Sequence, residues 1–112
     1  MAWLKIDDGF VEHSRVETLT DRAFRLHVSA LCLCARKLTD GRLTDLDARV
    51  VRTIARATAK HVAELEGCGL WEREPHGYTI RDYLDYNPSA EQVRKEREEA
   101  RERMRKLRVN GR

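Results

Sequence analysis

Residues 44–83 read TDLDARVVRTIARATAKHVAELEGCGLWEREPHGYTIRDY, and this stretch decides the fold. Its first part, residues 45–56, predicts a helix that starts after Thr44, because threonine is a favourable N-cap residue. Apolar side chains recur there at helical spacing, so we expect this helix to bury one face. The expected face consists of Leu46, Val50, Val51, Ile54 and Ala55.

A second, shorter helix is expected over residues 59–66, where Val62 and Leu65 would be buried. Beyond it, residues 70–74 and 78–83 are β-prone and flank a short turn, which predicts a hairpin. We expect Gly77 to occupy a turn position that needs a positive φ. Two helices followed by a hairpin indicate a winged helix-turn-helix, whose second helix would enter a major groove.

Upstream, residues 21–38 give the strongest helical signal, with Thr20 as N-cap and apolar side chains around most of the circumference. We expect this helix at the centre of the domain and a turn at Asp40-Gly41 after it. Its polar face is Arg22, Arg25, Ser29, Cys32 and Arg36. Before the long helix, the pattern predicts a strand over 3–6 and a short helix over 14–19.

Downstream, the composition changes and separates a body, residues 1–86, from a charged helical tail, residues 87–112. Ser89 and Gln92 form a capping-box pattern at the start of the tail helix. The expected fold class is therefore mainly α with a small β-hairpin: a winged helix-turn-helix plus a charged C-terminal helix.

The net charge of +3 is unevenly distributed along the chain. Residues 1–88 carry 13 Lys/Arg and 14 Asp/Glu, a balance of −1. Residues 89–112 carry 9 Lys/Arg and 5 Asp/Glu, a balance of +4. Any nucleic-acid footprint is therefore local on the body and denser in the tail.

Several classes of protein are not expected from these motifs. The chain has no P-loop, GxGxxG or HExxH motif and no Ser/His/Asp triad order, so we expect no enzyme and no cofactor. Cys32, Cys34 and Cys68 are spaced unlike zinc ligands, so we expect no metal site and read Cys34 as a core residue. No apolar run approaches the ~20 residues that cross a bilayer, and no signal peptide is visible, which predicts a cytoplasmic protein.

Three segments together resemble the N-terminal winged-helix domain of DnaD-like replisome-organiser proteins of phages and bacteria. They are Trp3-Leu4-Lys5-Ile6-Asp7 with Phe10, the long helix, and Leu65-Glu66-Gly67-Cys68-Gly69-Leu70-Trp71-Glu72 with Gly77-Tyr78-Thr79-Ile80. The resemblance covers residues 3–86 and implies a part in replication initiation, by origin binding or by assembly of partners. It implies no active site, and 112 residues leave no room for the second, single-strand-associated domain of that family.

Candidate DNA contacts lie on three parts of the chain. Arg49, Arg52 and Arg56 share one helical face and are the best phosphate candidates on the body; the alternative is pairing with Glu72 or Glu74. On the second helix, Thr58 and Lys60 would hold phosphates while His61 or Glu64 approaches bases, unless this face is merely solvated. On the hairpin, Arg73 and His76 would give support.

The tail allows three readings. Its cations, Arg101 and Arg105 among them, would follow DNA phosphates. Alternatively, Val93, Ala100 and Leu107 with Met104 would form a marginal coiled coil between two copies, or the helix is simply solvated.

The resulting hypothesis is a non-catalytic protein that binds double-stranded DNA, with single-stranded DNA as a further candidate ligand, and acts in replication initiation. One alternative is a transcriptional regulator of the same fold. Another is a protein–protein adaptor whose winged helix oligomerises without touching DNA. The row Arg49, Arg52 and Arg56 discriminates between them, because salt bridges there favour the adaptor and an open row beside Lys60 favours DNA.

Overall fold

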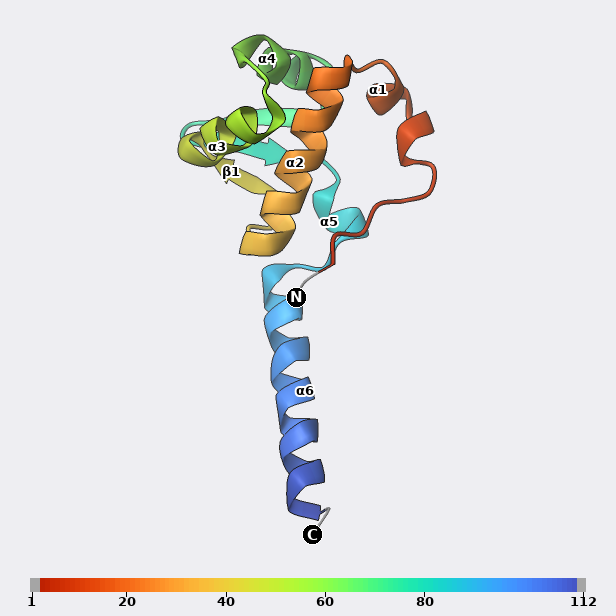
Figure 1. Cartoon of the computed structure of the whole chain (residues 1–112), viewed down its shortest axis with the longest axis vertical. Helices are drawn as coiled ribbons and strands as arrows, with labels where there is room; N and C mark the ends of the chain where they lie inside the picture. The colour runs from red at the N-terminus through yellow and green to blue at the C-terminus, as the bar shows by residue number, and fades with distance from the viewer. Residues whose placement is uncertain (1–2, 111–112) are drawn as a thin grey trace.

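A computed structural model describes residues 3–110 as a mainly helical body with a small antiparallel sheet, from which one long helix projects (Figure 1). The elements are a 3-10 turn at Phe10–Glu12, α1 Ser14–Glu17, α2 Asp21–Lys37, β1 Arg42–Thr44, α3 Asp45–Ala55, α4 Ala59–Gly67, β2 Trp71–Glu74, β3 Gly77–Ile80, α5 Tyr83–Tyr86 and α6 Ala90–Asn110. The expected order of helices and hairpin is therefore present. None of the helices within residues 3–110 is both long and apolar enough to span a membrane.

Helix α2 runs through the centre of the body, as predicted (Figure 1). It begins at the Thr20 N-cap and ends at Leu38, which has a left-handed conformation with φ 56°. Its buried residues are Ala23, Leu26, His27, Ala30, Leu31, Leu33, Cys34 and Ala35. Cys34 is a core residue, as expected, and Cys32 is exposed on the other side of the helix.

A buried polar pair joins α2 to the sheet. The indole nitrogen of Trp71 donates a hydrogen bond of 3.1 Å to Nδ1 of His27. Burial lowers the pKa of His27 to about 4, because a charged imidazolium would lose its hydration there. His27 is thus a neutral acceptor for Trp71 at physiological pH.

The hairpin is part of a three-stranded sheet in the order β1-β3-β2, so a strand was missed in the sequence. Strand β1 pairs antiparallel with β3, with Leu43 opposite Tyr78. This strand explains Gly77, whose φ is not positive, contrary to the prediction. A Cβ at Gly77 would collide with the carbonyl oxygen of Leu43. The glycine is needed there for close approach of β1, not for a left-handed turn.

Two other predicted elements differ from the structure. Residues 3–6 form no strand; instead, the Asn87 side chain accepts from the Lys5 amide at 2.8 Å and donates to the Lys5 carbonyl at 3.3 Å. The side-chain amide of Asn87 therefore satisfies the backbone N–H and C=O groups of Lys5, as a neighbouring strand would. The predicted strand 78–83 ends at Ile80, because Asp82 turns the chain with φ 62° before α5.

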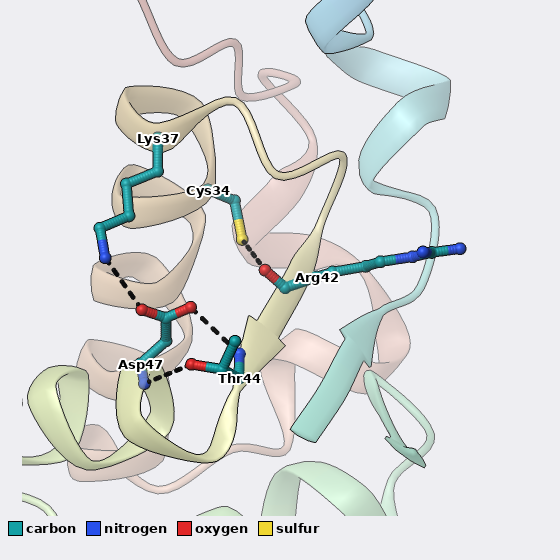
Figure 2. A network of polar contacts seen from close by, with 5 residues as sticks. All are labelled: Cys34, Lys37, Arg42, Thr44 and Asp47. Atoms are coloured by element: carbon teal, nitrogen blue, oxygen red, sulfur yellow. Dashed lines mark hydrogen bonds and ion pairs between the residues drawn. The ribbon is translucent and has the colours of Figure 1, made fainter. Parts of the chain in front are cut away.

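The junction of α2, β1 and α3 is held by Asp47 (Figure 2). Its carboxylate accepts from the Thr44 amide at 3.0 Å and pairs with Lys37 of α2 at 3.0 Å, while Thr44 Oγ1 accepts from the Asp47 amide. Burial alone would raise the pKa of Asp47, but the hydrogen bonds from Thr44 and Lys37 hold it below its ordinary value. This capping box sets the rotation of α3 about its axis.

The rotation of α3 contradicts the predicted buried face. Val51 and Ala55 are buried as expected. In contrast, Leu46, Val50 and Ile54 are exposed, at 65%, 41% and 55% of their surface. The face that packs contains Asp47 and Ala48 instead, because Asp47 is anchored to Lys37 of α2.

Helix α6 begins at the predicted capping box, in which Ser89 and Gln92 each bond the other's backbone amide. Its first amide, that of Ala90, donates to the carboxylate of Asp40 at 2.7 Å. Beyond this anchor the helix leads away from the body (Figure 1), and Met104 and Leu107 are exposed.

Candidate nucleic-acid interface

Two of the three arginines predicted to contact phosphates lie in a groove between α3 and α4. Arg49 and Arg52 line this groove, which has a volume of about 250 Å³. Its other lining residues are Asp45, Ala48, Ala59, Val62, Ala63, Glu66 and Tyr78. Arg56 lies outside it, as the left-handed C-cap of α3, and its carbonyl accepts from Arg22 at 3.3 Å.

Among residues 3–110, no acidic side chain forms an ion pair with Arg49, Arg52 or Arg56. The glutamates of the hairpin therefore do not neutralise the row; Glu74 accepts a hydrogen bond from Thr79 instead. Nε of Arg52 is buried and has no hydrogen-bond partner in the described part of the chain. A buried donor without a partner is costly, so Arg52 retains hydrogen-bonding capacity that no described residue uses.

The start of α4 brings Thr58, Lys60 and His61 together. Nδ1 of His61 accepts from the Thr58 amide at 3.0 Å, so the ring plays the N3 part of a capping box at the start of α4. Because Nδ1 accepts, the ring proton of neutral His61 lies on Nε2. Lys60 is exposed at this end of the helix, where free backbone N–H groups also favour an anion.

Glu64 does not lie on the face of α4 that borders the groove. Its two carboxylate oxygens accept from the amide and the hydroxyl of Thr20, at 2.7 and 2.8 Å. It therefore connects α4 to the N-terminus of α2, and we exclude it from the base contacts. The groove face of α4 carries Ala59 and Ala63, small side chains that permit close approach of a ligand and that the sequence analysis did not single out.

The hairpin is attached to α3 by a second network. Arg73 pairs with Asp45 at 2.8 Å and lies 4.8 Å from the centre of the Tyr78 ring. The Asp45 amide donates to the carbonyl of His76 at 2.9 Å. The side chain of Arg73 is therefore committed to the body, whereas His76 is exposed at the turn. Asp45 and Tyr78 were missed in the sequence, where nothing marks them as partners of Arg73.

Arg101 and Arg105, the two tail arginines named above as candidate DNA contacts, have acidic neighbours on their own helix. Arg101 lies 3.8 Å from Glu98, and Arg105 lies 4.0 Å from Glu102. Such exposed i,i+3 pairs contribute little to stability, but they partly neutralise the cations.

Across residues 3–110, no group of three His, Cys, Asp or Glu side chains is placed to hold a metal ion. Comparison with known protein families, curated proteins and solved structures finds no match for this chain. A functional argument therefore depends on the geometry and charge of the chain itself.

Proposed function

We propose that this protein is a non-catalytic winged helix-turn-helix module that binds double-stranded DNA through the α3–α4 groove and the start of α4. In this proposal α4 enters the major groove, β2 and β3 form the wing, and Arg49, Arg52 and Arg56 contact phosphates. At the N-terminal end of α4, Thr58 and Lys60 contact phosphates and Nε2 of His61 approaches the bases.

One observation carries the proposal: the arginine row of α3 has no acidic partner within residues 3–110, and Arg52 has a buried donor without an acceptor. Unpaired arginines are what phosphate binding requires, whereas an adaptor would pair these arginines with carboxylates. Glu66 also lines the groove, and its carboxylate limits how much negative charge the groove accepts.

The setting that we propose is replication initiation in the cytoplasm, because of the resemblance to DnaD-like replisome organisers. A transcriptional regulator of the same fold would use the same contacts. DNA sequence preference separates the two settings, since an origin binder and an operator binder differ in their sites and not in their phosphate contacts.

A salt-dependent binding measurement tests the proposal. Fluorescence anisotropy of a labelled duplex, at two salt concentrations, compares the native chain with an Arg49→Ala/Arg52→Ala variant. We expect the variant to bind at least about tenfold more weakly and to lose about two units from the salt slope, one for each phosphate contact.

The matched control is Arg101→Ala/Arg105→Ala, which removes the same charge from α6. We expect its duplex affinity to change by less than about threefold, because these side chains are already paired with glutamates. Equal losses in both variants would show that binding follows net charge and would refute an interface on α3 and α4. A parallel titration with single-stranded DNA shows which form is preferred.

A further inference from the structure

The exposed face of α3 is an apolar stripe on a helix that the rest of the body only partly covers. Leu46, Val50 and Ile54 follow one another at four-residue spacing, so their side chains form one row along the helix. Large apolar side chains scattered singly on a surface are common, but a continuous row of three indicates an interaction site.

The stripe is bordered by cations on the side of α2. The two helices are joined at both ends, by the Lys37–Asp47 ion pair and by the hydrogen bond from Arg22 to the Arg56 carbonyl. On α3, Val50 lies three residues after Asp47 and Ile54 lies in line with Asp47 two turns further on, so the stripe faces the α2 side of the junction. The polar face of α2 carries three exposed arginines, Arg22, Arg25 and Arg36, against one exposed acid, Asp21, at the start of the helix.

The opposite border of the stripe is also basic. Arg49 follows it on the side of the α3–α4 groove. The two acids of α3 are both occupied, since Asp45 pairs with Arg73 and Asp47 pairs with Lys37. An occupant of the stripe must therefore supply apolar side chains in the middle and negative charge at its edges.

We propose that this face, the stripe Leu46, Val50 and Ile54 with its arginine borders, docks an amphipathic segment of a protein partner that carries acidic side chains beside its apolar ones. Helix-in-groove and helix-on-face recognition use such apolar anchors at helical spacing. Complementary charge at the borders supplies orientation and a faster association rate. The apolar stripe of this docking face lies on the other side of α3 from Arg52, and the face shares only its border residue Arg49 with the proposed DNA groove.

Charge excludes the chain's own copies as occupants. Two copies that met on this face would bring the arginines of both α2 helices together, and like charges across an interface are costly. Helix α6 of a second copy is also a poor occupant, because three arginines, Arg97, Arg103 and Arg108, flank its apolar residues against one glutamate, Glu96. Its Glu98 and Glu102 point away from them, on the opposite side of the helix. DNA fits no better, because its backbone offers phosphates but no apolar partner for the three aliphatic side chains.

The test uses three labelled helical peptides of about 18 residues, with one leucine stripe in common and with Glu, Gln or Lys beside it. Anisotropy titrations with the full chain at low salt should show the glutamate peptide binding at least about tenfold tighter than the lysine peptide. Val50→Ser/Ile54→Ser should weaken the glutamate peptide by about tenfold or more. The matched control, Met104→Ser/Leu107→Ser, removes exposed apolar side chains from α6 and should leave its affinity unchanged.

The proposal is overturned if the glutamate peptide does not bind, if all three peptides bind equally, or if the α3 and α6 variants lose the same affinity. Two further measurements identify a different occupant. A monomer–dimer equilibrium that Val50→Ser/Ile54→Ser abolishes would assign the face to a second copy, and a loss of duplex affinity in this variant would assign it to DNA. Far-UV circular dichroism confirms that the variants are folded, as expected for changes at exposed positions.

Discussion

Arginines on α3 and arginines on α6 lie in two different surroundings. Arg49 and Arg52 are held by tertiary structure in a groove where no carboxylate pairs with them within residues 3–110. Arg101 and Arg105 project from a solvated helix, and each has a glutamate three residues before it. By composition the tail is the basic part of the chain, yet it is in the body that tertiary structure places two arginines without an ion-pair partner in one groove.

Packing differs between the two regions as well. The body surrounds α2 with side chains from α3, α4 and the sheet, and Leu26 and Leu65 are fully buried there. The apolar side chains of α6 are exposed at Met104 and Leu107. We infer that the body unfolds as one cooperative unit and that α6 contributes little to its free energy of unfolding.

A core truncation should give the largest difference between these regions. Leu26→Ala should lower the free energy of unfolding of the body by about 2–5 kcal/mol, because it leaves a cavity beneath α2. Leu107→Ala, the same chemical change on α6, should alter it by less than about 0.5 kcal/mol. Urea titrations followed by tryptophan fluorescence measure both values. A comparable loss in the two variants would show that α6 is part of the cooperative unit.

The His27–Trp71 pair should make the stability of the body depend on pH. Because the pKa of His27 falls from 6.5 unfolded to about 4 folded, the unfolded chain binds the extra proton between these values. Stability is therefore complete above about pH 6.5 and falls by about 3 kcal/mol as the pH approaches 4. His27→Gln keeps an acceptor for Trp71 and should remove most of this slope.

The exposed His76 provides the control for that measurement. In His76→Gln the slope of unfolding free energy between pH 6.5 and 4 should match that of the native protein. If His27→Gln retains the native slope, burial of this imidazole is not the cause. Below this window the depressed pKa of Asp47 adds a further loss, since its contribution disappears as the carboxylate is protonated.

The smallest expected difference between the two regions comes from removing one ion pair in the body and one on α6. Asp47→Ala removes the capping box of α3 and the partner of Lys37, and should cost about 1–2 kcal/mol in the unfolding of the body. Glu98→Ala removes one exposed pair from α6 and should change only the helical signal at 222 nm, by an amount that corresponds to a few tenths of a kcal/mol. Equal effects on body unfolding would contradict the separation of the two regions.

Much of the fold could be predicted because local signals agreed with tertiary packing. The N-caps Thr20 and Thr44, the capping box at Ser89 and the long apolar pattern of α2 marked helices that the structure contains. Burial of Val62 and Leu65 is also confirmed. Strand β1 could not be predicted, because three residues carry too little periodicity and their pairing partner β3 lies far along the chain.

The candidate interface was predicted less completely. The arginine row could be found by its three- and four-residue spacing, but the local pattern of Glu64 says nothing of Thr20, which lies 44 residues away. From the sequence alone, the Arg73 side chain could equally be open to a ligand or paired within the chain, and only the fold brings it to Asp45 and Tyr78. Whether these groups contact DNA is the subject of the binding experiments above.

The sequence by itself determined the four longer helices, where α2 and α6 begin, and that a neutral body precedes a charged tail, because caps, periodicity and composition act over a few residues. Tertiary structure alone decided which side of α3 is buried. Its apolar residues surround more than half of the helix, so periodicity allowed Leu46, Val50 and Ile54 to point inwards. In the fold, Asp47, Ala48, Val51 and Ala55 are buried instead, which leaves those three residues exposed and places Arg52 in the groove, and the ion pair between Asp47 and Lys37 of α2 accompanies this rotation.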